Sequence, residues 1–493
     1  MANNDSNSNS SNGVSEYSSL IIMNEKTGEC MMMSNENKKK DYTVIPHKFY
    51  GFPSIPFNLN TNMVQYDKHA DGINSLNNTY QQFMVNQLPL ESMQHALPPV
   101  KDTFYLGSLV TPFYIDQINR HLHHYFLLLV DSNNSPASES LNKIIKQDDL
   151  ESQLQWISAV ELVQEFEQSS KLLTPETLYM LRLLKMFKNR DQLGKLVKPD
   201  DDQNIGITKP LEYAPFIESI PVRSNTLMPF CSTNLIVSQS NGYVMVVDPG
   251  SNHHGAPHFE NIIQKKLKPY LNQQEGGKQL YIFITHNHHD HWHGLPMLER
   301  HFPQATLVAH PITLENIPTS LKTRPVLGKP LNAKVLNNTS DNNNQLVIGD
   351  RVFEIISTPG HTADSLCLFE PTTKTLIAGD HIVGWGSSIL DPHGGGDMKE
   401  YLDNTQGMID HLKPSIAMPA HGPTHYEPIA LLSNYISHRL AREHDILSAY
   451  QQGNKTLNQL LNVVYKGIDP KLNELAKGNI HLHLEKLKKD NKL

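Results

Sequence analysis

The sequence predicts an α/β protein with more than one domain, and three observations support this class. Its 493 residues exceed one ordinary domain, since a domain usually takes roughly 100–200 residues. Apolar, strand-like runs such as 279–284 are interspersed with segments of helical periodicity such as 259–270. Several of the strand-like runs end in histidine or aspartate, which places side chains with metal-binding chemistry at strand ends.

The composition divides the chain into consecutive parts. An Asn/Ser tract at the start cannot bury enough apolar surface to fold, and a polar, helix-breaking stretch near residue 200 is expected to be a linker. We therefore expect a disordered tract, an α/β domain, a linker, a second α/β domain and a helical tail, over residues 1–14, 15–197, 198–209, 210–425 and 426–493.

The most informative stretch is Thr285–Gly294, which follows the apolar run 279–284. That run predicts a buried strand. His286 and His288 are two residues apart on nearly extended chain, so their rings project the same way and can hold one cation. Asp290 and His291 come around the following turn and can reach a second site beside the first.

Three later strand ends carry further candidate ligands. His361 follows the strand predicted at 352–356, Asp380 ends the hairpin of 366–369 with 375–378, and His421 follows 416–420. A turn at Asp248–Gly250 closes another hairpin, formed by 234–237 and 243–247. These side chains are expected to gather at one rim of the sheets, where sites of such folds are built.

The pattern His-x-His-x-Asp-His after a hydrophobic strand and a threonine resembles the signature of the metallo-β-lactamase superfamily. The resemblance implies a four-layer αββα sandwich. It also implies one metal site at His286, His288 and His361, a second at Asp290, His291 and His421, and Asp380 as the bridge between them. In this family the Asp248 turn lies beneath the metals and orients the ligands.

The resemblance predicts a hydrolase. Imidazole suits Zn²⁺, so two zinc ions per chain are expected, with Mn or Fe as alternatives at the carboxylate-bearing second site. Two cations about 3.5–4 Å apart would turn a bridging water into hydroxide, with Asp290 and Asp380 as catalytic residues that orient it. Asp380 stands where the commonest β-lactamases use cysteine, and Cys367 lies inside a strand, so β-lactamase activity is not expected.

Residues from about 210 to 493 resemble the β-lactamase-like protein 2 group, through segments such as Gly379–Gly386, Pro419–Pro423 and His438–Leu440. That resemblance implies an endoribonuclease acting on single-stranded RNA. The tail resembles a winged helix with a lysine-rich end, which either packs on the sandwich or holds RNA phosphates. A thioester or acyl hydrolase related to glyoxalase II is the alternative, since one dinuclear site serves many substrates. A non-catalytic scaffold is a third reading.

The first half of the chain resembles a Nudix α/β sandwich between residues 105 and 158, in its Val110–Pro112, strand and Trp156–Ser158 order. The cluster of carboxylates that a Nudix hydrolase needs for Mg²⁺ is missing between residues 51 and 107. We therefore expect a catalytically inactive Nudix-like domain.

Composition restricts partners and compartment. The net charge of −8 provides no global attraction for nucleic acid or anionic membranes. Three scattered cysteines suggest a reducing compartment, and neither an apolar membrane span nor a signal peptide is evident. We expect a cytoplasmic protein without a membrane partner, whereas the family resemblance offers the mitochondrial matrix. The sequence does not predict the oligomeric state.

Overall fold

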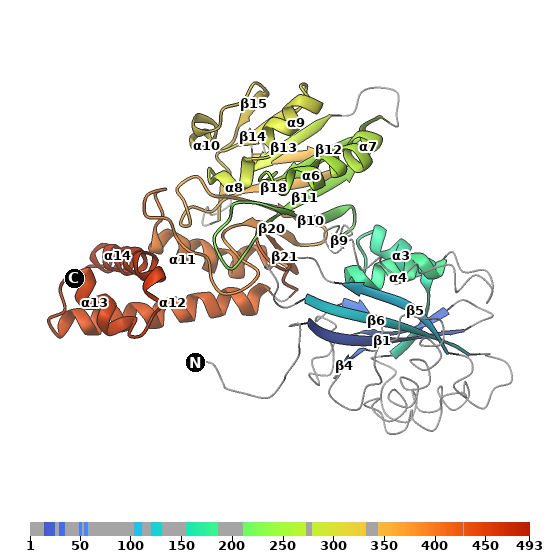
Figure 1. Ribbon diagram of the computed structural model, residues 1–493, viewed down its shortest axis with the longest axis horizontal. Coiled ribbons are helices and arrows are strands. Elements are labelled where there is room, and N and C mark those ends of the chain that lie inside the picture. The colour runs from blue at the N-terminus through green and yellow to red at the C-terminus, as the bar shows by residue number, and fades with distance from the viewer. Residues whose placement is uncertain are drawn as a thin grey trace. The chain divides into compact units, whose positions relative to one another are not determined.

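A computed structural model describes this chain over residues 14–24, 29–34, 49–51, 54–57, 103–110, 120–130, 154–185, 211–272, 279–331, 344–426 and 428–493. The chain divides into two compact units, Met1–Pro215 and Phe216–Leu493. The predicted linker 198–209 and residues 1–13 of the predicted Asn/Ser tract lie outside the described residues. Figure 1 labels the elements in chain order.

The first unit contains a mixed sheet with the strand order β5-β6-β1-β2-β3-β8, in which β4 also pairs with β1 and β7 with β2. The apolar runs 17–23 and 30–33, on either side of a Thr-Gly pair, predict a hairpin, which is confirmed because β1 and β2 pair antiparallel. Its strands are Val14–Asn24 (β1), Glu29–Ser34 (β2), Phe49–Gly51 (β3), Ser54–Phe57 (β4), Thr103–Val110 (β5), Arg120–Val130 (β6), Leu154–Ser158 (β7) and Leu172–Leu173 (β8).

The described part of this unit also contains two helices, close to the ranges of about 159–166 and 175–187 that the sequence pattern predicts. Helix α3 spans Ala159–Glu167 and begins where the Ser158 side chain accepts a hydrogen bond from the Glu161 amide. Helix α4 spans Pro175–Lys185, and strand β9, Leu211–Ala214, ends the unit. The buried side chains of α3 include Leu162 and Phe166, which recur at helical spacing on one face.

The second unit begins with a sheet in the order β15-β14-β13-β12-β11-β10. Its members are Ile217–Arg223 (β10), Ser232–Ser240 (β11), Tyr243–Val247 (β12), Leu280–Ile284 (β13), Thr306–Ala309 (β14) and Lys322–Pro325 (β15). The predicted hairpin is confirmed, because β11 and β12 pair antiparallel. Strands β12, β13 and β14 then run parallel, so their carboxyl ends share one edge.

One face of this sheet packs against helices. The buried cluster joins strand residues such as Leu235 and Ile282 to Phe259 of α6 and Leu298 of α9. These helices are Ala256–Ile262 (α6), Lys268–Asn272 (α7), His289–Trp292 (α8), Leu295–His301 (α9) and Pro311–Asn316 (α10), with a π-helical turn at Ile263–Leu267 between α6 and α7. The sequence pattern predicts helices over 259–270 and over 295–301, and both are confirmed.

A second sheet has the order β16-β18-β19-β20-β21, with β17 paired to β18. It consists of Lys329–Pro330 (β16), Gln345–Ile348 (β17), Arg351–Ser357 (β18), Leu366–Glu370 (β19), Thr375–Gly379 (β20) and Ile416–Pro419 (β21). Strands β19 and β20 are buried at every residue, so both faces of this sheet are covered. Helices cover one face and the other sheet covers the second, which gives the expected four layers (Figure 1).

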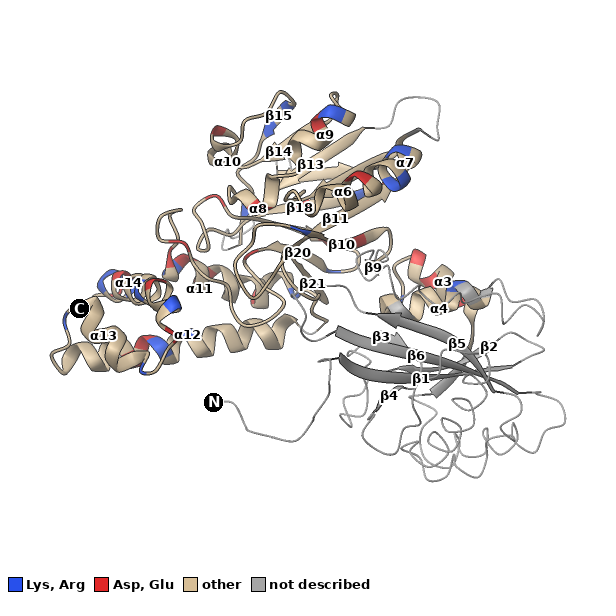
Figure 2. Ribbon diagram, viewed as in Figure 1, with Lys and Arg blue, Asp and Glu red and all other residues tan. Residues whose placement is uncertain are grey.

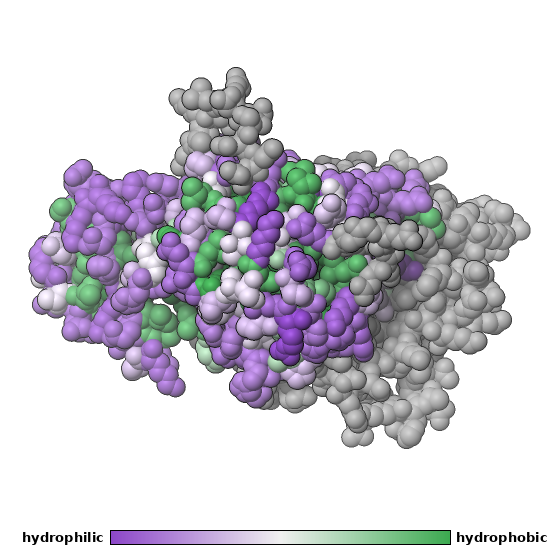
Figure 3. All heavy atoms as spheres, turned by 90° about the horizontal axis from the view of Figure 1, so that it is seen from above, coloured by the Kyte–Doolittle hydropathy of each residue, from purple (hydrophilic) through white to green (hydrophobic). Residues whose placement is uncertain are grey.

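Four helices complete the unit, namely Met398–Gly407 (α11), Pro428–Gln451 (α12), Leu457–Val464 (α13) and Asn473–Lys489 (α14). Leu460, Ile480 and Leu487 share a separate buried cluster with Ile446 of α12, so the last three helices pack on one another. Figure 3 shows mostly hydrophilic side chains over these helices, with apolar ones between them. Among the described residues, no helix is long and apolar enough to cross a membrane.

Apolar residues at helical spacing predict a buried stripe along α12, and this prediction is wrong at one of its positions, which are Ile429, Leu432, Ile436, Leu440 and Leu447. Leu440 is 45% exposed, whereas Arg439 and Glu443 are buried beside Leu432 and Ile446. Hydrophobic periodicity assigns charged residues to the solvent-exposed face of a helix. Here Arg439 and Glu443 are buried, because each has a polar partner in the interior.

The lysine-rich end of α14 does not present free positive charge. Lys486 pairs with Glu443, Lys488 with Glu485, and Lys489 with Asp397, and Lys492 lies near Glu443 and Asp490. Basic and acidic residues lie close together on α14 in Figure 2, whereas α13 has no charged residue. The contacts favour the expectation that this end packs within the protein.

The N-terminus of α13 provides a test of local stability. The Thr-x-x-Gln spacing predicts a capping box, and it is formed: the Thr456 hydroxyl accepts from the Gln459 backbone amide, and the Gln459 side chain accepts from the Thr456 backbone amide. Thr456→Ala should destabilise α13 by about 1 kcal/mol, so amide hydrogen exchange over Leu457–Val464 should be about fivefold faster. The exposed Asn462→Ala is the control, and equal exchange in both variants would contradict the cap's role.

Candidate metal centre

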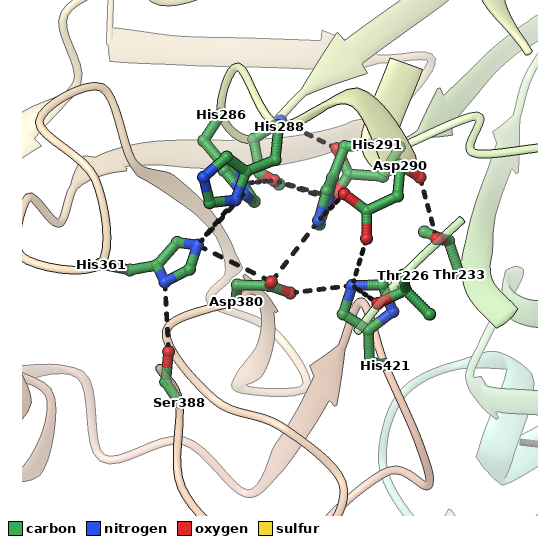
Figure 4. Close-up of polar contacts among 12 residues, drawn as sticks. Thr226, Thr233, His286, His288, Asp290, His291, His361, Asp380, Ser388 and His421 are labelled. Atoms are coloured by element: carbon green, nitrogen blue, oxygen red, sulfur yellow. Dashed lines mark hydrogen bonds and ion pairs between the residues drawn. The ribbon is translucent and has the colours of Figure 1, made fainter. Parts of the chain in front are cut away.

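Three histidine rings meet at the end of β13 and β18. His286 and His288 follow β13, and His361 follows β18 after the turn Thr358–Gly360. His286 Nε2 lies 3.0 Å from His288 Nδ1, and His361 Nε2 lies 3.3 and 3.2 Å from those two atoms. Three ring nitrogens therefore face one another around one point, as Figure 4 shows.

A second group forms beside the first, from Asp290 and His291 on α8 and His421 after β21. His421 Nε2 lies 3.2 Å from Asp290 Oδ2, and His291 Nε2 lies 3.8 Å from Asp290 Oδ1. The carboxylates and imidazoles of this group are buried or nearly so.

Asp380, at the end of β20, lies between the two groups. Its Oδ2 is 3.7 Å from His361 Nε2 and 3.6 Å from His291 Nε2, so one oxygen faces a member of each group. Its Oδ1 is 3.4 Å from His421 Nε2. This is the arrangement expected of a carboxylate that two cations share (Figure 4).

Each of the five histidines has an acceptor for its outer ring nitrogen. The partners are Thr285 Oγ1 at 3.0 Å for His286, Asp391 Oδ2 at 3.1 Å for His288, Asp248 Oδ2 at 2.9 Å for His291, the Ile389 carbonyl at 2.6 Å for His361 and the Ser232 carbonyl at 2.9 Å for His421. These contacts fix the tautomer in which the inner nitrogen has a free lone pair, as metal-binding histidines require.

Asp248 holds the loop that carries the ligands through contacts with Thr285 and His291. Its carboxylate accepts from the Thr285 amide at 2.9 Å and from the Thr285 hydroxyl at 2.8 Å, and also contacts His291. The close approach of this turn requires Gly250, because a Cβ there would lie 1.8 Å from the Asp290 carbonyl oxygen. The hydrophobic strand, the threonine and the Asp-x-Gly turn therefore hold the ligand loop in place.

Two members of the three-histidine group, His286 and His361, are held neutral by lowered pKa values. Burial, together with the neighbouring imidazoles, holds the pKa of His286 well below its usual range. Burial likewise lowers the pKa of His361 to about 4, although the nearby Asp380 carboxylate opposes this. Neutral imidazole is the form that binds a metal ion.

The two histidines of the second group have raised pKa values instead. Burial alone would lower the pKa of His291, but the carboxylates around it, Asp248 foremost, raise that pKa well above its usual range. The pKa of His421 is raised as well, because Asp380 and Asp290 outweigh its burial. Conversely, these imidazoles keep the pKa values of Asp290 and Asp380 below their usual range despite burial.

The donor atoms fit metal ions. With Zn–N bonds of about 2.0–2.1 Å, the nitrogens of a tetrahedral site lie about 3.3 Å apart, close to the 3.0–3.3 Å of the three-histidine group. His291 Nε2 and Asp380 Oδ1 are buried and have no hydrogen-bond partner in the described part of the chain. Such atoms are costly unless they have a partner, and a cation between the groups would supply one.

The structure brings together all seven side chains that the sequence proposed as ligands. Cys367 is not among them: it is buried in β19 against Thr358, and burial raises the pKa of its thiol to about 12. Asp391, by contrast, was not foreseen. It comes from a loop far along the chain, and no spacing in the sequence connects it to His288.

The pKa shifts predict different pH dependence for the two groups. His291 and His421 have raised pKa values, so a metal ion entering there must displace protons, and its affinity should rise with pH. His286 and His361 have lowered pKa values and are already neutral. Calorimetric titration with zinc between about pH 6 and about pH 8, in buffers of different ionisation enthalpy, should show proton release mainly in the step at the second group. Equal release in both steps would contradict this assignment.

Asp391→Asn tests the partner of His288. The amide lacks the charge that holds the imidazole, so zinc affinity of the three-histidine group should fall about 10- to 100-fold in a chelator competition assay. Asp403→Asn, at an exposed site on α11, is the matched control and should leave the affinity unchanged. Unchanged affinity in Asp391→Asn as well would show that this contact does not support the ligand.

Comparison with known proteins agrees with this geometry. Residues 228–425 match the family described as Metallo-beta-lactamase superfamily, and residues 456–493 match the Beta-lactamase associated winged helix domain. Neither match reaches the first unit, so the Nudix-like assignment stays a prediction.

Three relatives illustrate the range of similar proteins. The Beta-lactamase-like protein 2 homolog of Drosophila melanogaster is 31% identical over 233 residues, which cover 45% of this chain and 72% of that protein. Its Caenorhabditis elegans namesake is 29% identical over 151 residues, covering 30% and 49%. Atrochrysone carboxyl ACP thioesterase of Aspergillus chevalieri is 25% identical over 182 residues, covering 36% and 49%.

The chain thus spans about half the length of the last two relatives and most of the first. The Drosophila relative is 31% identical, and the match covers 72% of its length. The two groups of histidine and aspartate side chains lie within residues 228–425, which match the superfamily. The fold of two sheets flanked by helices and the C-terminal helical domain agree with the same assignment. The chain belongs to the metallo-β-lactamase superfamily, whose members are metal-dependent hydrolases.

Proposed function

We propose that this protein is a dinuclear zinc hydrolase that cleaves single-stranded RNA. The observation that carries the dinuclear assignment is the position of Asp380, whose Oδ2 lies at nearly equal distance from His361 and His291. His286, His288 and His361 would hold one zinc ion, and Asp290, His291 and His421 the other. When bound, such a pair supplies a hydroxide nucleophile at neutral pH and takes up charge on the attacked centre.

The side chains of the site have separate roles in this proposal. Asp380 joins the two groups, so it sets their spacing and the direction of attack. Asp290 lies 3.2 Å from His421 and would accept a hydrogen bond from the attacking water. Asp248 holds His291 and Thr285 rigid, so these donors need little reorganisation during the reaction.

Two observations support RNA as the substrate. The first is the similarity to proteins of the β-lactamase-like protein 2 group, whose resemblance suggested an endoribonuclease. The second is an exposed aromatic ring near His421: Trp385 is 36% exposed and stacks on the buried Phe230, whose ring centroid lies 5.9 Å from that of Trp385 and 5.8 Å from that of His421. Unpaired bases bind to aromatic side chains in a sequence-tolerant way.

A thioester hydrolase is the second candidate, and it also rests on observations. The relative from Aspergillus chevalieri is named a thioesterase. The segments 224–231 and 382–396, which contact His421 and His361, contain no Lys or Arg. Loops without basic residues suit an uncharged acyl group, whereas with RNA the metal ions themselves must neutralise the phosphate.

A direct comparison of substrates tests the proposal. The zinc-loaded full-length chain is offered a labelled single-stranded RNA and, separately, an acyl thioester. We expect RNA cleavage that falls by at least about 100-fold in Asp380→Asn, since the shared carboxylate loses its charge. Asp403→Asn is again the control, because it has the same chemistry at an exposed site.

The outcomes separate the two candidates. RNA cleavage that is lost in Asp380→Asn, with an intact thioester, supports the nuclease. Turnover of the thioester with intact RNA makes the second candidate the function. RNA cleavage that survives Asp380→Asn comes from a contaminating nuclease and counts against the proposal.

A further inference from the structure

Arg439 occupies an unusual position in α12. Only 3% of its side chain is exposed, and no ion pair joins it to another described residue. Its Nη2 donates to the Ser388 carbonyl at 2.6 Å, and its Nη1 lies 3.8 Å from Met398 Sδ. The guanidinium stacks on Tyr401, with Cζ 4.4 Å from the ring centroid. A buried charge without a carboxylate partner is costly, so its placement needs a compensating role.

The hydrogen bond to Ser388 leads directly to a metal-facing histidine. The next carbonyl, that of Ile389, lies 2.6 Å from His361 Nδ1, and the Ser388 hydroxyl lies 3.4 Å from the same nitrogen. Figure 4 shows Ser388 beside the His361 ring, on the side away from the other ligands. Arg439 therefore holds the residue whose backbone and side chain orient His361.

Tyr401 connects the same arginine to neighbouring backbone. Its hydroxyl donates to the His381 carbonyl at 2.9 Å, one residue after Asp380. A Cβ at Gly360 would lie 2.5 Å from Tyr401 Cα, so the chain before His361 rests directly on this tyrosine. The stacked guanidinium and ring thus contact two of the three ligand loops of the second sheet, those that carry His361 and Asp380.

We infer that Arg439 is a positioning residue for the metal centre: through Ser388 and Ile389 it fixes the His361 ring, so that metal affinity of the three-histidine group depends on helix α12. The inference rests on the proposed ligands and is independent of whether the substrate is RNA or a thioester. It assigns the C-terminal helices a part in building the hydrolytic site.

Arg442, one turn further along α12, is a matched control. Its Nη1 donates to the Val464 carbonyl at 3.0 Å, and its Cζ lies 4.5 Å from the Tyr465 ring centroid. Both arginines lie on α12, and each donates to a main-chain carbonyl and stacks on an aromatic ring. The carbonyl and the ring that Arg442 contacts belong to Val464, the last residue of α13, and to Tyr465 directly after it. Substitution of Arg442 therefore reports what a structural role alone costs.

The experiment compares Arg439→Lys, Arg439→Met and Arg442→Met in the full-length chain. Zinc affinity is measured by stepwise competition with a chromophoric chelator. The variant Asp290→Ala identifies which binding step belongs to the second group. Thermal unfolding of each metal-free protein reports its stability. The visible absorption of Co²⁺ bound at the three-histidine group reports its geometry independently of activity.

We expect Arg439→Met to weaken the three-histidine step by about tenfold or more and to alter the cobalt spectrum. Arg439→Lys should be intermediate, since an ammonium can still donate to the Ser388 carbonyl but cannot stack as a planar fork. Arg442→Met should leave both signals as in the wild type.

Unchanged affinity and spectrum in Arg439→Lys and Arg439→Met would overturn the inference, and so would an equal loss in Arg442→Met. If Arg439→Met does not fold, the result for Arg439→Lys decides alone. Wild-type zinc affinity of the three-histidine group in Arg439→Lys would then count against the inference. A wild-type chain that binds no metal would instead refute the metal centre, and this inference with it.

Discussion

The need to neutralise buried charge governs the second unit. Three carboxylates and five imidazoles meet at one end of the two sheets, and most of them are out of contact with water. Carboxylates in such a place are costly unless cations or protons compensate them. The raised pKa of His291 and His421 shows the compensation by protons, and zinc ions would replace those protons. Folding and metal binding therefore share one requirement, and a bound metal stabilises the fold by mass action.

The site exists only where both sheets are in place. One sheet supplies the loops after β12 and β13, and the other supplies those after β18, β20 and β21. Backbone hydrogen bonds cross between them close to the ligands, from Leu366 to the Thr285 carbonyl at 2.9 Å and from Asn234 to the Ala420 carbonyl at 2.7 Å. Through Arg439, helix α12 also helps to position the loop that holds His361. A hydrolytic centre thus forms from loops that no single layer could hold in position.

Sequence reasoning succeeded where a short pattern carried the chemistry. The strand before His286, the turn at Asp248 and the strand ends at His361, Asp380 and His421 were all recognisable, because ligand types at the ends of apolar runs leave a local signal. Asp391 left no such signal, and Arg439 belongs to a segment that resembles the family but gives no indication of its role, because both roles depend on contacts with residues far along the chain. Hydrophobic periodicity placed Leu440 inside and its charged neighbour outside, because a pattern of apolar residues cannot register a buried guanidinium.

Two of the five histidines are oriented by main-chain carbonyls, those of Ser232 and Ile389. Every amino acid offers such a carbonyl, so the geometry of the ligand does not depend on which side chain stands at that position. The Ile389 side chain itself is 41% exposed. A residue beside the reacting centre can therefore change its outward chemistry while its backbone continues to hold the histidine, and substrate preference can diverge within this architecture without loss of the hydrolytic machinery.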